Sequence, residues 1–141
     1  SSFHHNHLAL FLGAMSNLSN GHATFSAGLD YNYFFMESEP QFGIGLIAEG
    51  AFGEHSEYIV GLPLVLLPTH SMKFFIAPSV LFKEEKEIDE IHETDATKFL
   101  LRIGGAYMFH FDNFSLAPTL QADVVGSEVS LVYGISFGLG F

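Results

Sequence analysis

The chain of 141 residues contains no cysteine, and only five of its residues are lysine or arginine, against 16 aspartates and glutamates. The absence of cysteine excludes a disulfide framework and thiolate chemistry. The net charge of −11 argues against nucleic acid as a partner, because nucleic-acid binding usually needs a basic surface. No signal peptide is recognisable at the start of the sequence. A mature exported chain would look like this, and so would a shortened one.

Long hydrophobic runs are also missing. No stretch of about 18 apolar residues occurs, so a membrane-spanning helix is not expected. Yet hydrophobic residues make up 48% of the chain and charged residues only 15%, below the roughly 25% usual in soluble domains. The apolar residues must therefore follow a shorter period, and the 16 phenylalanines, five tyrosines and 14 glycines favour strands and tight turns.

Apolar and small or polar residues alternate with a period of two in eight segments separated by turn-like breaks. The last segment is the clearest, since Tyr133, Ile135 and Phe137 share one face while Gly134 and Ser136 share the other. We predict strands at 4–17, 22–36, 42–53, 57–67, 72–83, 97–111, 114–125 and 129–141.

Residue size indicates which face points outward. The faces rich in Gly, Ser, Ala and Thr suit the narrow interior of an eight-stranded barrel, whereas the bulky apolar faces would not fit there. Eight such faces form a large apolar band that lipid tolerates and water does not. The sequence therefore predicts one all-β domain over 1–141, an eight-stranded antiparallel up-and-down transmembrane β-barrel. The alternative is a soluble, lipocalin-like barrel with its apolar face turned inward around an apolar ligand.

Eight strands place both termini at one end of the barrel. The longest break, 84–96, falls at the other end, which fits an extracellular loop and periplasmic termini. Aromatic residues are expected in two bands, one near each membrane interface. Pro63, Pro78 and Pro118 fit poorly, because a closed barrel has no free edge, and we expect bulges or irregular pairing there.

The final segment, from Tyr133 to Phe141, resembles the terminal strand of bacterial outer-membrane barrels. The whole chain is similar to small OmpA/OmpX-type barrels and to uncharacterised short outer-membrane β-barrel proteins. This resemblance implies that Phe137, Leu139 and Phe141 form the signal read by the barrel-assembly machinery. It also implies outer-membrane lipid and lipopolysaccharide as surroundings, other envelope proteins as further partners, and no particular activity.

The inward faces carry several charged or amide side chains, which need partners inside a narrow barrel. Counting along the strands places Glu49 and Arg102 in the outer half, and Lys98 and Asp123 near the outer rim. Asp30 and Lys73 fall toward the periplasmic half. We expect a polar lumen network centred on Arg102, formed by Asp30, Glu49, Lys73, Lys98, Arg102, Gln121 and Asp123. A structural plug is favoured over a proton or solute path, because side chains fill a barrel of eight strands.

Other candidate sites are weaker. The 83–95 segment holds seven carboxylates, but their spacing is not that of a calcium-binding loop. Such a run of charges is usually a segment exposed to solvent. His5 and His7 would share one strand face and His4 the other, which gives too few ligands for a metal site. No catalytic motif is present, although small barrels include lipid-modifying enzymes. We therefore expect a non-enzymatic barrel without metal or cofactor, with a structural or interaction role.

Overall fold

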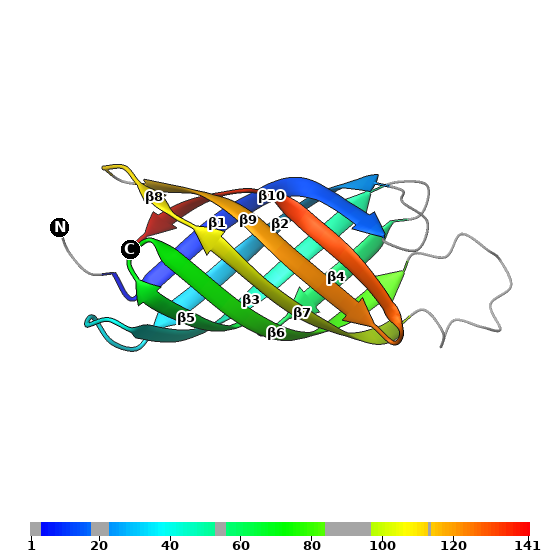
Figure 1. The fold of residues 1–141 in the computed structure, drawn as a ribbon, viewed down its shortest axis with the longest axis horizontal. Coiled ribbons are helices and arrows are strands. Elements are labelled where there is room, and N and C mark those ends of the chain that lie inside the picture. Colours follow the sequence, from blue (N-terminus) through cyan, green and yellow to red (C-terminus); the bar gives the residue numbers. More distant parts are fainter. Residues whose placement is uncertain (1–3, 18–22, 53–55, 84–96, 113) are drawn as a thin grey trace, which may run out of the picture.

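The structure is a computed structural model that describes residues 4–17, 23–52, 56–83, 97–112 and 114–141. The described chain forms one closed antiparallel barrel (Figure 1). The strands are β1 (Asn6–Asn17), β2 (Ala23–Phe34), β3 (Gln41–Phe52), β4 (Glu57–Gly61), β5 (Leu64–Thr69), β6 (Met72–Lys83), β7 (Thr97–Tyr107), β8 (Phe109–His110), β9 (Phe114–Val125) and β10 (Glu128–Gly140). Strands β4 and β5 follow one another in a single course of the wall, as do β7 and β8, so the wall has eight courses.

The barrel closes between its first and last strands. Strand β1 pairs with β10, and Asn6 and Phe141 exchange both backbone hydrogen bonds, with N···O distances of 3.1 and 2.8 Å. Each course otherwise pairs with its neighbours in sequence, which is the up-and-down order. The predicted fold class is thus confirmed. Below, the terminal end is the end at which Asn6 and Phe141 lie, and the opposite end is the distal end.

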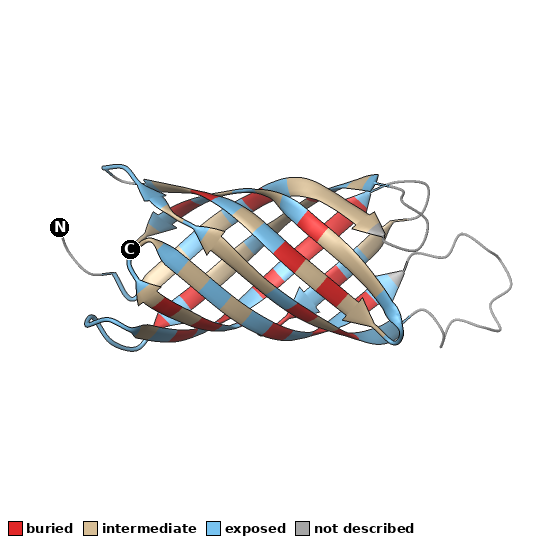
Figure 2. Cartoon of the chain, viewed as in Figure 1, coloured by how far each residue is buried: buried red, intermediate tan, exposed pale blue. Residues whose placement is uncertain are grey.

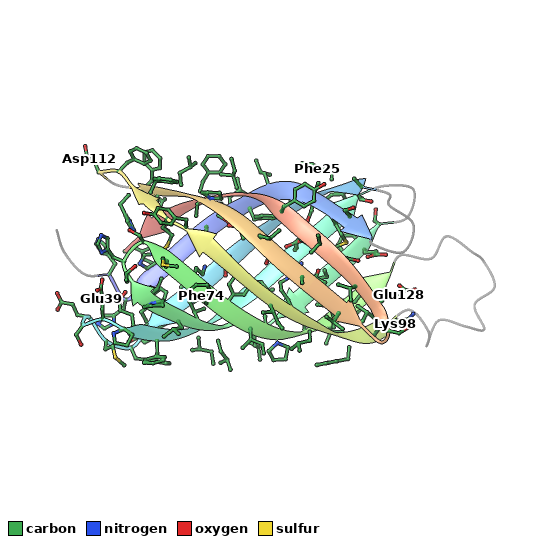
Figure 3. The ribbon with its side chains drawn as sticks, in the orientation of Figure 1. Phe25, Glu39, Phe74, Lys98, Asp112 and Glu128 are labelled. Atoms are coloured by element: carbon green, nitrogen blue, oxygen red, sulfur yellow. The ribbon has the colours of Figure 1, made fainter. Side chains whose placement is uncertain are left out.

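Burial alternates along the strands, as Figure 2 shows. In β2, Ser26 is fully buried whereas Leu29 is 54% exposed. Phe25 and Phe74 are 54% and 43% exposed and lie on the wall between its ends, whereas the exposed charged residues Glu39, Asp112, Lys98 and Glu128 lie at its two ends (Figure 3). The outer surface is therefore apolar along its length and charged at its ends, as a lipid-embedded barrel requires.

Exposed aromatic rings gather near both ends. At the terminal end the rings of Phe111 and Phe114 stack with centroids 5.0 Å apart. Near the distal end Phe52 lies 6.3 Å from Phe25 and 6.2 Å from Tyr58. These contacts join neighbouring strands, so they belong to bands that run around the barrel. Within the described residues there is no helix long and apolar enough to cross a membrane.

The prolines interrupt the wall without opening it. Gly45 donates to the carbonyl of Pro63 and Leu62 to that of Pro78, both at 3.0 Å. In a regular antiparallel ladder each such pair would form two backbone hydrogen bonds, but proline has no N–H to donate the second. Strand β4 therefore ends before Pro63 and β5 begins after it, with the register against β3 and β6 unchanged.

Pro118 faces the junction of β7 and β8, and the register there is also kept. The prediction of bulges or irregular pairing at these three prolines is confirmed in its second form, since the pairing is irregular while the register is kept. The register shift in this region lies between Leu66 and Thr69 instead, next to Pro68.

Candidate functional site: the barrel lumen

Arg102 lies at the centre of the lumen and binds two carboxylates. Its direct neighbour across the ladder is Asp123, because the register pairs these residues between β7 and β9. The Arg102 Nε donates to Asp123 Oδ1 at 2.7 Å and Nη2 donates to Asp123 Oδ2 at 2.8 Å. Two parallel bonds of this kind fix the plane of the guanidinium as well as its position.

Glu49 reaches the same guanidinium from β3. Arg102 Nη1 donates to Glu49 Oε1 at 2.7 Å and Nη2 donates to Oε2 at 3.1 Å. Because β4 and β6 separate β3 from β7 in the wall, this contact crosses the lumen instead of following the sheet. Ser26 of β2 donates a further hydrogen bond to Glu49 Oε2 at 2.6 Å. We call Glu49, Arg102 and Asp123 the Arg102 triad.

The triad is buried, since its side chains are 2% to 5% exposed. Charged groups taken out of water are costly unless each is paired and hydrogen-bonded, and this geometry meets that condition for the guanidinium. The guanidinium makes two hydrogen bonds to each carboxylate. It therefore links the two sides of the lumen rigidly, because moving any of the three groups breaks several charge-assisted bonds together.

A second ion pair lies nearer the terminal end. Lys73 Nζ of β6 donates to Asp30 Oδ2 of β2 at 3.1 Å, and Asn32 Nδ2 donates to Asp30 Oδ1 at 3.3 Å. The lysine ammonium also lies 5.7 Å from the centroid of the Phe75 ring. This pair is less buried than the triad, with side chains 15% and 22% exposed.

Two buried apolar clusters also lie in the lumen. On the distal side, Ile59, Leu81 and Leu100 form a buried cluster against which Met15 and Val125 pack. At the terminal end, Phe34, Val65 and Leu67 form another, with Phe75 and Met108. The Arg102 triad thus has an apolar cluster on its distal side, whereas at the terminal end the Asp30–Lys73 pair lies beside apolar side chains.

An internal chamber of about 70 Å³ lies between the Arg102 triad and the terminal end. Its walls include both charged pairs and apolar side chains, and among its lining residues are His7, Asn32, Glu49, Lys73, Arg102 and Gln121. A buried water needs roughly 10–15 Å³ measured in this way, so the chamber has room for several.

The predicted lumen residues are only partly brought together. Six of them line the chamber or belong to the triad, but Lys98 is exposed at the distal rim (Figure 3). The predicted placement of Asp123 near that rim beside Lys98 is wrong, because Asp123 lies level with Arg102. Gln121 is buried and lines the chamber without joining either ion-pair group.

Sequence reasoning missed Ser26 and Asn32 as members of the network. Both occupy inward positions of the predicted second strand, so the alternation contained the signal. The alternation does not give the register between β2 and β3, which pairs Ser26 with Ala51 and Gly28 with Glu49.

The N-terminal histidines do not converge. His5 stacks on the outward Tyr33 at 5.3 Å, whereas His7 meets the inward Phe34 edge-on at 5.1 Å. The prediction that His5 and His7 share a face is therefore wrong, because β1 begins only at Asn6 and His5 lies outside its regular alternation. The described chain has no group of three or more His, Cys, Asp or Glu residues that could hold a metal ion. The acidic 84–96 segment lies outside the described residues.

The last strand presents its predicted signal residues to the outside. Phe137, Leu139 and Phe141 are 42%, 53% and 61% exposed. They lie on the outer face of β10 and its C-terminal end, beside β1 on one side and, for the first two, β9 on the other.

The closed wall of eight courses, apolar outside and ionic inside, defines the protein as a small β-barrel of the outer-membrane type. No family model and no curated protein sequence matches it. Solved structures do. The N-terminal β-barrel domain of Pseudomonas aeruginosa OprF aligns with a TM-score of 0.63 at 12% identity, covering 99% of this chain and 100% of that one.

Two further structures show the same architecture. Ail, the attachment invasion locus protein of Yersinia pestis, aligns with a TM-score of 0.59 at 12% identity over 96% of this chain and 97% of that one. The outer membrane enzyme PagL aligns with a TM-score of 0.52 at 13% identity over 96% and 99%. At these identities the likeness establishes the fold and leaves the activity open.

Proposed function

We propose that this chain is a non-enzymatic integral protein of a bacterial outer membrane, with a closed lumen and a structural or interaction role. The observation that carries the proposal is the Arg102 triad, which crosses the lumen with its charges buried and paired. The apolar layer of Ile59, Leu81 and Leu100 lies on its distal side. Water-filled pores line their walls with hydrated polar groups, which is the opposite arrangement.

Planar-bilayer recording tests the closed lumen. The purified barrel should give no stable unitary steps under conditions in which a general porin, reconstituted in parallel, does conduct. Stable steps from the unmodified chain would contradict the plug. A variant with Arg102→Ala and Leu100→Ala thins both layers and should conduct in bursts if these layers are what blocks the lumen.

Membrane residence is proposed from the outer surface. Its exposed positions carry large apolar side chains along the strands, and the exposed charged residues lie at the two ends (Figure 3). The soluble, ligand-carrying alternative would need that surface to face water. Expression in a Gram-negative host followed by fractionation should place the chain in the outer membrane and make its extraction depend on detergent. Recovery in a soluble fraction without detergent would revive the alternative.

We propose that the terminal end faces the periplasm, since barrels of this type keep their short turns there. The absence of native cysteine makes a clean labelling test available. Ser127 lies in the exposed turn between β9 and β10 at the distal end, and Ser38 lies in the exposed connection between β2 and β3 at the terminal end. In intact cells an impermeant maleimide should label Ser127→Cys, and should label Ser38→Cys only after the outer membrane is permeabilised. The reverse pattern would invert the proposed orientation.

The proposed partners are lipid and lipopolysaccharide around the wall, the barrel-assembly machinery during insertion, and other envelope proteins. The exposed Phe137, Leu139 and Phe141 support recognition by the assembly machinery. Deleting Phe141 should lower the amount of assembled barrel in cells while leaving refolding in detergent largely intact. A lipid-modifying activity is tested by lipid A profiling: a change on overexpression of this chain would contradict the non-enzymatic role.

A further inference from the structure

Gln121 has a buried side-chain amide that no protein group binds. The residue is 6% exposed and lines the chamber, and its side chain makes no hydrogen bond to any described residue. Among the described residues, Asn32 Oδ1 is the only buried side-chain atom that lacks both a hydrogen-bond partner and accessible surface. The Gln121 amide therefore keeps accessible surface, which faces the chamber. A buried amide without a partner is costly, so a bound molecule that hydrogen-bonds to it would be stabilised.

The register sets the surroundings of Gln121. The residue pairs with Gly104 of β7 and lies two residues from Asp123 along β9, at the end of the chamber next to the Arg102 triad. A Cβ at Gly104 would lie 3.0 Å from Gln121 Cγ and 2.5 Å from the Phe75 ring. Because Gly104 has no side chain, the ring and the glutamine both occupy the space above it. An apolar face and a free amide thus lie side by side.

Toward the terminal end the chamber is lined mainly by apolar or small residues. Phe34, Leu67 and Met108 of the apolar cluster at that end line it, as do Ala117 of β9 and Gly138 of β10. A buried water typically makes about three hydrogen bonds, and water finds few partners against such side chains. An apolar group bound there would displace poorly bonded water, which favours binding.

The charged groups of the chamber favour a neutral ligand. Both carboxylate oxygens of Asp30 and both of Glu49 already accept hydrogen bonds, so a cation would find no free oxygen there. An anion is disfavoured as well, because the lumen holds the carboxylates of Asp30, Glu49 and Asp123 against the two cationic groups of Lys73 and Arg102.

We propose that the chamber binds a small neutral amphipathic molecule, with a hydroxyl or amide group at Gln121 and an apolar body against Phe75. The glutamine amide has two N–H donors and an acceptor oxygen, so it can both donate to and accept from such a group. The chamber has room for about five to seven water-sized groups, which suits an alcohol or amide with a short aliphatic chain. The lining residues His7 and Met108 are half-buried, so the ligand reaches the chamber from the terminal end.

NMR of the full chain in phosphatidylcholine nanodiscs tests the proposal with three probes of equal chain length, namely pentanol, pentanoate and pentylammonium at neutral pH. Pentanol should shift the Gln121 side-chain amide signals saturably, with a millimolar dissociation constant, and the two ions should not. The other glutamine, Gln41, hydrogen-bonds to the carbonyls of Met36 and Glu37 and does not line the chamber, so its side-chain signals are the internal reference. Equal shifts at both glutamines, no saturation, or tighter binding of an ion would overturn the proposal.

Two variants separate binding in the chamber from partition into the surrounding lipid. Gln121→Leu removes the polar group at similar side-chain size and should weaken pentanol binding about tenfold, followed at the backbone amides of the lining residues Ala117 and Thr119. Ala117→Leu fills the chamber from β9 and should abolish the saturable shift at Gln121. Gln41→Leu is the matched control and should keep the original affinity. If one chamber variant does not fold, the other decides, and unchanged affinity in a folded chamber variant would overturn the site.

A chamber that holds water alone has its own signature. Gln121 would then show contacts to water in nuclear Overhauser spectra and no shift with any probe, which would overturn the proposal. The ligand site goes beyond the closed lumen of the proposed function, and the two fail separately. Conductance of the unmodified chain would overturn the plug, whereas Gln121 signals that ignore every probe would overturn only the ligand site.

Discussion

At the scale of single residues, Arg102 is the position on which most of the lumen depends. It donates four hydrogen bonds to two carboxylates on opposite sides of the barrel. Its removal would leave the carboxylates of Glu49 and Asp123 buried without the cation that both bind. The cost of breaking a buried pair comes mainly from such stranded charges.

We therefore predict that Arg102→Ala lowers the free energy of unfolding by about 3–5 kcal/mol, measured by urea denaturation in phosphatidylcholine vesicles. Lys98→Ala is the matched control, because Lys98 is exposed at the rim, and should change stability by less than about 0.5 kcal/mol. A combined variant, Arg102→Met with Glu49→Gln and Asp123→Asn, should recover much of the loss. Equal losses in the single and combined variants would show that packing, not charge, stabilises this layer.

A second residue-scale prediction concerns the seam where the barrel closes. Gly13 and Gly134 face each other between β1 and β10, and a Cβ at Gly134 would lie 2.2 Å from the Leu12 carbonyl oxygen. Gly134→Ala should therefore cost about 1–3 kcal/mol. Gly105→Ala, whose Cβ would meet its nearest atoms at 3.3–3.4 Å, should cost much less in the same unfolding assay. Similar costs at both positions would contradict the close approach.

At the scale of elements, the prolines decide where the courses of the wall break. Because Pro63 has no N–H, Gly45 and Pro63 share one backbone hydrogen bond instead of the usual two. Strands β4 and β5 nevertheless keep one register, because closure of the barrel holds both to β3 and β6.

Pro63→Val should restore that N–H and produce a slowly exchanging amide at position 63, detectable by hydrogen-exchange NMR. The amide of Leu62, already bonded to Pro78, is the internal reference. The change in stability should be small, since the new hydrogen bond of about 0.5–1.5 kcal/mol opposes the extra freedom of the unfolded chain. A fast-exchanging amide at 63 would mean that the wall is distorted there for another reason.

At the scale of the whole molecule, the ring of hydrogen bonds is what lets an antiparallel sheet lie in lipid without an exposed edge. Closure rests on the pairing of β1 with β10, whose residues are separated by nearly the full length of the chain. Residues facing each other across this seam are therefore sensitive reporters of a correctly assembled barrel.

A cysteine pair at the seam tests closure. A Cβ at Gly138 would lie 3.6 Å from the Cβ of Ala9, close to the mean separation of about 3.8 Å in disulfides. Ala9→Cys with Gly138→Cys should oxidise to an intramolecular bridge, read as a mobility shift on non-reducing gels and as loss of free thiol. Ala9→Cys with Phe137→Cys, slipped by one residue, places the thiols on opposite faces and should stay reduced. A bridge in the slipped pair would contradict the register.

The sequence by itself determined the eight courses of the wall, their closure and the face turned outward, because alternation is a local property and bulky side chains cannot fit a narrow interior. It also identified Arg102, Glu49 and Asp123 as inward residues. Only the tertiary structure decided which of them meet. Glu49 and Arg102 lie 53 residues apart on strands that are not neighbours, so their contact depends on the stagger set when the ring closes. The register between β7 and β9 likewise sets Asp123 beside Arg102 instead of Lys98. The registers of β4 and β5 against β3 and β6 also continue unchanged across Pro63.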